Sequence, residues 1–318
     1  MTIQDVQAAR ERLVGRVHRT PLVSSETLSR RLGTRVYLKL ELFQKTGSFK
    51  PRGAFNKMLA AVPAGSRVVA ASGGNHAQGV AYAATALGLP STILMPANTP
   101  QNYVDATRGY GGEVVLVENI ARALDEMARL QGEGAVAVHP FDDPLVVAGQ
   151  ATVGLEILED LPQVTDLIVS IGGGGLAGGV GLVAKHANPS TRIWGVETVG
   201  ADAMSQALAA GRPVQLPAIT SIAKTLGAPE VSPLTLQLVR QYLEGVTVVP
   251  DAEAVEALVE LAERVKVLPE PSASCTLAAA QRLRGQLGSH VVLILCGGNV
   301  SIADVCRFTA NHPAAPAS

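Results

Sequence analysis

Short apolar runs alternate with segments of helical periodicity along most of the chain. Runs rich in Val, Ile and Ala are the predicted strands, at 36–40, 67–71, 92–95, 114–117, 135–138, 167–171, 192–196, 246–249 and 291–295. Apolar residues recur every three or four positions in the predicted helices, at 3–14, 51–61, 78–87, 121–131 and 251–268, the last with Asp251 as its expected N-cap. Repeated strand–helix–strand order predicts an α/β protein with mainly parallel sheets.

Composition narrows the classes of function. With 318 residues the chain can bury a substantial core, and its net charge of −1 offers no basic field for nucleic acid or anionic lipid. We expect a small-molecule partner, no nucleic acid and no membrane, because no apolar run is long enough to span a bilayer. The first residues lack a secretory signal, and three cysteines without metal-ligand spacing fit a reducing cytoplasm. The tail, 311–318, is predicted to be disordered.

The segment Glu41-Leu42-Phe43-Gln44-Lys45-Thr46-Gly47-Ser48-Phe49-Lys50-Pro51-Arg52-Gly53-Ala54 draws attention to one lysine. A random lysine is usually a solvated surface residue. Lys50, however, stands beside an aromatic ring at the entry to a predicted helix. If burial lowers its pKa, the neutral amine can condense with a carbonyl and then move protons.

Three further stretches follow predicted strands. Ser72–Gly79 and Gly172–Gly179 are glycine-rich turns that open helices, so their backbone N–H groups suit anions such as a carboxylate or a phosphate. Gly172, Gly174 and Ala177, with Glu197 after the next strand, also fit a dinucleotide-binding pattern. That alternative leaves Lys50 without a role. The third stretch, Cys296-Gly297-Gly298-Asn299, comes near the end of the chain.

These four stretches, in this order from Lys50 to Asn299, resemble the pyridoxal-phosphate-dependent threonine/serine dehydratase and serine racemase family. The family has the tryptophan-synthase-β-like fold, known as fold type II. The resemblance implies two open, twisted, mainly parallel sheets flanked by helices, with the cofactor in the cleft between two domains. Residues 67–143 would form the small domain, and 1–66 with 144–318 the large cofactor-binding domain, although no linker divides the chain. A homodimer is implied as well.

The resemblance also implies a role for individual residues. Lys50 would bind the cofactor covalently and act as the catalytic base. The other expected cofactor-binding residues are Phe49, Asn75, Gly172, Gly173, Gly174, Gly175, Glu270 and Cys296. The residues expected to bind the substrate carboxylate are Ser72, Gly73, Asn75 and His76.

The chain departs from the family pattern at three places. Gly73 stands where serine racemases have a second serine, which serves as acid/base on the face opposite the lysine. Cys296 replaces the usual serine at the pyridine nitrogen, and cysteine is the weaker hydrogen bonder. Glu197, Ala201 and Asp202 resemble part of a cation site, but Ala203 replaces a further acid, so a divalent cation is doubtful and no metal ligand is assigned.

The expected activity is dehydration of a 3-hydroxy amino acid to a 2-oxo acid and ammonia. L-Threonine is the first expectation and L-serine a secondary substrate, because Phe141 stands where racemases have a polar asparagine. A bulkier substrate such as 3-phenylserine is the alternative. A serine racemase is less favoured, since racemisation needs a base on each face and Gly73 has no side chain to supply one. A dinucleotide-binding oxidoreductase is also less favoured. The regulatory extension of isoleucine-controlled threonine deaminases is not expected.

Overall fold

Two sheets organise the molecule, and the larger has six strands in the order β1-β2-β10-β7-β8-β9. The computed structural model describes residues 1–312. Only β1 and β2 pair antiparallel, while every other neighbouring pair in this sheet is parallel. The strands are β1 (Leu22–Ser24), β2 (Arg35–Leu40), β7 (Asp166–Ser170), β8 (Arg192–Thr198), β9 (Gly245–Val249) and β10 (His290–Leu295).

The smaller sheet is wholly parallel and comes from one continuous part of the chain. Its order is β5-β4-β3-β6, and its strands are β3 (Val68–Ala71), β4 (Ser91–Pro96), β5 (Glu113–Val117) and β6 (Val136–Ala137). Successive side chains of β3 face opposite sides of the sheet. Val68 and Ala70 pack in one apolar cluster, and Val69 and Ala71 in another. The central strand β3 is therefore buried on both faces, whereas the edge strand β5 is largely exposed.

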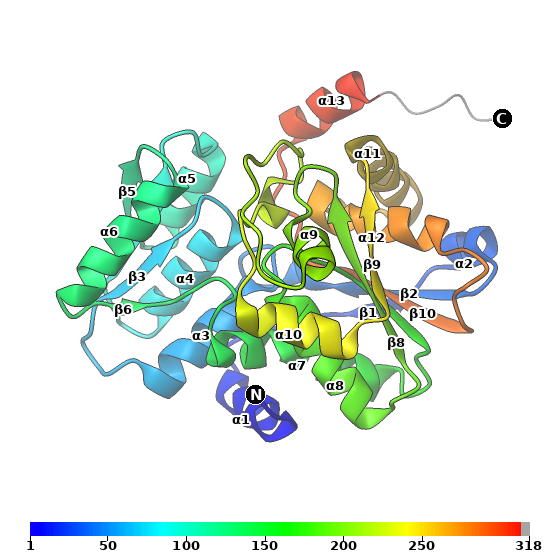
Figure 1. Ribbon diagram of the computed structural model, residues 1–318, viewed down its shortest axis with the longest axis horizontal. Coiled ribbons are helices and arrows are strands. Elements are labelled where there is room, and N and C mark those ends of the chain that lie inside the picture. Colours follow the sequence, from blue (N-terminus) through cyan, green and yellow to red (C-terminus); the bar gives the residue numbers. More distant parts are fainter. Residues whose placement is uncertain (313–318) are drawn as a thin grey trace.

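Helices cover both sheets, as Figure 1 shows. They are α1 (Ile3–Leu13), α2 (Glu26–Leu32), α3 (Lys50–Ala61), α4 (Asn75–Ala86), α5 (Gln101–Gly109), α6 (Ile120–Gly132), α7 (Pro144–Asp160), α8 (Gly175–Ala187), α9 (Ala203–Ala210), α10 (Pro233–Tyr242), α11 (Asp251–Glu260), α12 (Pro271–Arg282) and α13 (Ile302–Asn311). α12 packs on β7, β8, β9 and β10, and α7 packs along α8 and α3. The chain thus has the predicted fold class, a mixed α/β fold with two mainly parallel sheets flanked by helices.

All nine predicted strands form, with ends that differ by at most two residues, and the central ones, such as β3, β7 and β10, are almost wholly buried. The predicted helix 251–268 is shorter than expected: α11 ends at Glu260 and passes into a π-helical turn over Leu261–Val265. Asp251 is not the N-cap, which is Pro250. The Asp251 carboxylate instead accepts hydrogen bonds from Ser221 Oγ (2.6 Å) and Ile222 N (3.0 Å).

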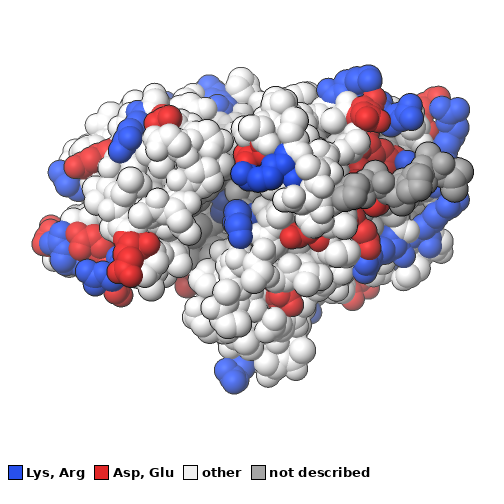
Figure 2. Space-filling view, turned by 90° about the horizontal axis from the view of Figure 1, so that it is seen from above, with Lys and Arg blue, Asp and Glu red and all other residues white. Residues whose placement is uncertain are grey.

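Two further sequence-based expectations concern the C-terminal tail and a membrane span. Asn311 is the last residue of α13, and the rest of the predicted disordered tail, from 313 on, lies outside the described residues. Among the described residues no helix is both long and apolar enough to cross a bilayer. Figure 2 shows acidic and basic side chains intermingled on one face, which is hollowed between the part that holds the small sheet and the rest.

Candidate active site

Lys50 is the first residue of α3, and Pro51 follows it in the first turn, where a missing N–H costs nothing. Gly79 of α4 lies against its backbone: a Cβ at position 79 would come within 3.0 Å of Lys50 Cβ. This close approach fixes where the lysine starts. Its Nζ donates to Pro140 O at 3.0 Å and lies 5.1 Å from the centroid of the Phe49 ring.

The surroundings of Lys50 favour a neutral amine. Removal of the ammonium from water lowers the pKa of Lys50 to about 8, although the nearby Cys296 and Glu270 act in the opposite direction. About a tenth of Lys50 is therefore uncharged at pH 7, a far larger fraction than for a lysine with the usual pKa of about 10.4. A neutral amine is the form that attacks a carbonyl or accepts a proton.

The tetraglycine run connects β7 to α8, and Gly174 is the N-cap of that helix with φ of 89°. This left-handed conformation suits glycine. Among residues 1–312, the backbone N–H groups of 172–177 donate to no protein acceptor. Free N–H groups at a helix N-terminus form an anion site, which the helix dipole reinforces.

Phe141 packs directly on the glycine run. A Cβ at Gly173 would lie 1.9 Å from Phe141 Cδ1, and one at Gly175 would lie 3.3 Å from Phe141 Cβ. The ring also stands edge-on to His139, with centroids 4.7 Å apart. Any residue larger than glycine at 173 would therefore displace this ring. Phe141 follows Pro140, whose carbonyl accepts from Lys50, so the ring lies at the junction of lysine and glycine run.

A second unpaired set of N–H groups lies at the turn between β3 and α4. Ser72 N donates to Leu94 O (3.0 Å), and Gly74 N donates to Ser72 Oγ (3.2 Å). Within the described chain, the N–H groups of Gly73, Asn75 and His76 have no protein acceptor. This turn can thus hold a carboxylate by its main chain.

His76 is oriented away from that role. Its Nε2 lies 2.7 Å from Val138 O, and burial lowers the pKa of His76 well below 6.5, so the ring is neutral. Because a carbonyl oxygen only accepts, Nε2 carries the ring proton and Nδ1 is an acceptor. The side chain cannot donate to a carboxylate in this state. Its backbone N–H, which has no protein acceptor, is the group that can bind an anion.

Asn75 belongs to a buried polar network centred on Glu270. Its Nδ2 donates to Glu270 Oε1 (2.8 Å), and its Oδ1 accepts from Asn299 Nδ2 (2.7 Å). Thr225 Oγ1 (2.8 Å) and Ser272 Oγ (2.7 Å) donate to the same Glu270 oxygen. Glu270 Oε2 is buried without a protein partner, and burial raises the pKa of Glu270.

Cys296 follows β10 and is buried beside a second thiol. Its Sγ lies 3.6 Å from Ser272 O and 4.0 Å from Ser170 Oγ, and Cys275 Sγ contacts the same two groups. Burial raises the pKa of Cys296 well above 9 and that of Cys275 to about 12. Both thiols are therefore protonated at neutral pH, and Cys296 can offer an S–H donor but no thiolate.

The three weak cation candidates do not assemble a ligand set. Glu197 accepts from Met204 N (2.8 Å), Ser205 N (2.8 Å) and Ser205 Oγ (2.6 Å), so its carboxylate binds the N-terminus of α9. Asp202 lies at the N-cap position of the same helix, and Ala201 offers only a backbone oxygen. In the described part of the chain no cluster of three His, Cys, Asp or Glu residues could hold a metal.

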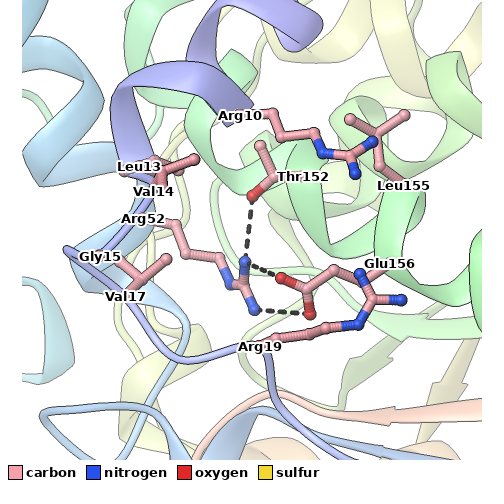
Figure 3. A pocket seen from close by; sticks show the side chains of 10 residues that line it. All are labelled: Arg10, Leu13, Val14, Gly15, Val17, Arg19, Arg52, Thr152, Leu155 and Glu156. Carbon is pink, nitrogen blue, oxygen red and sulfur yellow. Dashed lines mark hydrogen bonds and ion pairs between the residues drawn. The ribbon is translucent and has the colours of Figure 1, made fainter.

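Two residues after Lys50, a buried arginine anchors α3 to the protein. Arg52 donates to both carboxylate oxygens of Glu41 (2.8 Å each) and to both of Glu156 (2.7 and 3.0 Å). Lys39 Nζ also reaches Glu156 Oε2, at 2.5 Å. Figure 3 shows Arg52, Thr152 and Glu156 at the inner wall of a cavity of about 210 Å³. The ion pairs hold the first turn of α3, and with it Lys50, in place.

The structure thus brings several predicted site residues to one region: Phe49, Lys50, the turn at 72–76, Glu270 and Cys296. The glycine run is linked to Lys50 through Pro140 and Phe141. Two sets of free N–H groups and the unpartnered Glu270 Oε2 fit a bound molecule that carries a phosphate and polar ring atoms. Sequence reasoning missed Thr225 and Ser272 as partners of Glu270. Neither lies in a recognisable pattern, although Ser272 is only two positions after Glu270.

Comparison with known proteins agrees with this geometry. A family model described as pyridoxal-phosphate dependent enzyme matches residues 14–297. The chain is 40% identical to L-threonine ammonia-lyase of Thermotoga maritima, over 97% of this chain and 78% of that protein. It is 39% identical to serine racemase of Oryza sativa subsp. indica, over 94% and 91%.

A solved structure is similar as well. Maize serine racemase matches with a TM-score of 0.92 and 38% identity, over 98% of this chain and 97% of that one. The matching family model names pyridoxal phosphate, and not a dinucleotide, as the cofactor. The chain therefore belongs to the family of pyridoxal-phosphate-dependent enzymes and is an enzyme of the threonine/serine dehydratase type, with pyridoxal phosphate as its cofactor.

Proposed function

We propose that the protein eliminates water from L-threonine to give 2-oxobutanoate and ammonia, with L-serine as a poorer substrate. In the overall reaction the Cα–H and Cβ–O bonds break, water leaves, and a second water releases the nitrogen as ammonia. The observation that carries this proposal is the pairing of a lysine whose pKa is lowered to about 8 with a glycine at position 73. One proton carrier is thus present on the lysine side, and residue 73 adds none.

Each predicted residue has a role that its surroundings support. The N–H groups of Gly172, Gly173, Gly174 and Gly175 would bind the cofactor phosphate, and Phe49 would pack beside the ring. Asn75 has one amide hydrogen left after its bond to Glu270, and this hydrogen would bind the phenolic oxygen. Cys296 would offer its S–H to the ring nitrogen, and Glu270 would lie near the ring.

Pyridoxal phosphate supplies, when bound, a conjugated ring that accepts electrons from the carbon next to the substrate nitrogen. Lys50 would hold the cofactor, and its neutral Nζ would accept the Cα proton of the substrate. Ser72 and the N–H groups of Gly73, Asn75 and His76 hold the substrate carboxylate. Fixing the carboxylate orients the Cα–H bond toward Lys50, which is a positioning contribution to the rate.

The choice of substrate rests on Phe141. This ring covers the glycine run next to Pro140 and presents an apolar surface near Lys50, which favours a β-methyl group over a bare hydroxymethyl group. 3-Phenylserine is the alternative if the pocket accepts a larger group. Serine racemase is the second candidate function, because relatives of that name match the chain at 39% identity.

The substrate proposal predicts a clear order of activities. We expect the purified holoenzyme to lose its visible absorption band on treatment with borohydride, and to release 2-oxo acid faster from L-threonine than from L-serine, 3-hydroxyaspartate or 3-phenylserine. Formation of D-serine would be measured in the same samples. Preference for 3-phenylserine, or inversion of serine faster than its elimination, would contradict the proposal and support the corresponding alternative.

The lowered pKa of Lys50 predicts how the apoenzyme takes up its cofactor with pH. Only the neutral amine attacks the aldehyde, and its fraction rises through a pKa of about 8. The uptake rate, followed by visible absorbance, should therefore increase from pH 6.5 and level off above about pH 9. A rate that still climbs tenfold per pH unit between 8.5 and 9.5 would show that Lys50 has the pKa of an exposed lysine.

We also propose the domain division, assembly and location that the family suggests. Residues 67–143, which include the whole small sheet, would form the small domain, and 1–66 with 144–318 the large one. Limited proteolysis tests this division. We propose a homodimer in the cytoplasm, and sedimentation analysis of the holoenzyme tests its oligomeric state.

A further inference from the structure

The space beside Gly73 is filled by Thr99, which lies in the loop after β4. A Cβ at position 73 would lie 2.6 Å from Thr99 Oγ1 and 3.4 Å from Pro96 Cδ. Thr99 follows β4, and its backbone N donates to Pro96 O at 2.9 Å, which fixes the turn that carries the side chain. The hydroxyl of Thr99 therefore stands beside the carboxylate-binding turn.

The same loop is tied to the rest of the site on both sides. Before it, Leu94 O accepts from Ser72 N, so β4 and the turn are held together. After it, Tyr103 on the first turn of α5 donates its hydroxyl to Asn299 O, beside the Cys296 segment. Thr99 thus lies in a loop that hydrogen bonds hold in place on both sides, although the residue is only partly buried.

The hydrogen-bonding state of the Thr99 hydroxyl decides what it can do. It makes no hydrogen bond to any of residues 1–312, whereas Ser72 Oγ already accepts from Gly74 N. No carboxylate or imidazole is bonded to Thr99 Oγ1 that could take its proton. A threonine hydroxyl without such a base is a hydrogen-bond donor and acceptor, not a proton carrier.

We propose that Thr99 binds the substrate: its hydroxyl donates a hydrogen bond to the substrate carboxylate at the 72–76 turn and supplies the polar contact that residue 73 lacks. This inference rests on the proposed function, because it assumes an amino acid substrate whose carboxylate lies at that turn. It adds a side-chain donor to a set otherwise made of backbone N–H groups and Ser72. Gly73 then serves to leave room for the threonine.

The test compares two amines in holoenzyme variants. L-Alanine has a carboxylate and no leaving group, and L-alaninol has a hydroxymethyl group in place of the carboxylate. Dissociation constants are measured for both from the change in visible absorbance. Loss of a hydrogen bond to a charged group should weaken L-alanine binding by roughly tenfold or more in Thr99→Val, while L-alaninol binding changes less than about twofold. Thr99→Ser should restore L-alanine binding.

Three results would overturn the inference. They are unchanged L-alanine binding in Thr99→Val, equal weakening of both amines, which indicates a structural role, and failure of Thr99→Ser to restore binding. If unchanged L-alanine binding in Thr99→Val came with loss of serine racemisation, the role of Thr99 would be to move a proton. The titrations require no elimination, so a wild-type enzyme that binds L-alanine but dehydrates nothing would refute the proposed function alone.

Discussion

Replacement of Lys50 by alanine should reduce ammonia release from L-threonine at least about 10³-fold, because it removes both the covalent anchor of the cofactor and the proposed base for the Cα proton. The expected loss is in kcat and not only in KM. The purified variant should also lack the borohydride-sensitive absorption band. Steady-state kinetics and the visible spectrum before and after reduction measure the two effects.

Lys57 provides a matched control on the same helix. Its Nζ pairs with Asp143 Oδ2 at 2.7 Å, the two side chains are 17% and 15% exposed, and Lys57 is not a residue of the proposed site. Lys57→Ala should keep the spectrum and most of the turnover, which shows that loss of a lysine from α3 is tolerated. If Lys50→Ala kept turnover within tenfold of wild type, the proposed mechanism would be wrong.

Replacement of Arg52 by methionine should destabilise the holoenzyme by about 3–5 kcal/mol, because it leaves buried carboxylates without their main partner. Arg52 and Glu41 have side chains 1% and 0% exposed, and Glu156 is 13% exposed. The midpoint and slope of urea unfolding give the change in free energy. The matched control is Arg31→Met: Arg31 pairs with Glu260 but is 60% exposed, so we expect a loss below about 1 kcal/mol.

The Arg52 variant should also respond differently to pH. In the wild type, Arg52 is the main group that lowers the pKa of Glu41, against the effect of burial. A lowered folded-state pKa stabilises the protein above 4.5, and this contribution is lost as the pH falls. Without the arginine, burial raises the pKa of Glu41. The free-energy cost of burying the ionised Glu41 carboxylate then grows as the pH rises above 4.5. The difference in the free energy of unfolding between Arg52→Met and wild type should thus be larger at pH 8 than at pH 5. A loss of stability that does not depend on pH would contradict this account.

The strands and the chemistry-bearing turns could be predicted from the sequence because their signals are local. A short, mainly apolar run followed by Ser72-Gly73-Gly74, or by four glycines at 172–175, specifies a buried strand that ends in a turn and opens a helix. The same holds for Lys50, which a proline places in the first turn of its helix. Helix ends were less well predicted: the π-helical turn after Glu260 leaves no mark in the apolar period.

Contacts between distant segments could not be predicted in this way. Pro140 O accepts a hydrogen bond from Lys50 Nζ, Thr225 donates to Glu270, and Thr99 fills the space at Gly73. No spacing in the sequence relates these pairs. His76 is a second example, because the carbonyl of Val138 fixes its tautomer and removes the donor that the sequence suggested.

The amino-acid sequence by itself determined the fold class, the candidate lysine and the two glycine-rich turns proposed to bind anions, since each depends on residues that are neighbours along the chain. Only the tertiary structure decided the charge state of Lys50, the partners of Glu270 and the place of Thr99. The physical reason is that pKa values and side-chain hydrogen bonds depend on burial and on atoms within a few ångströms. The packing of two sheets brings those atoms together from distant parts of the chain.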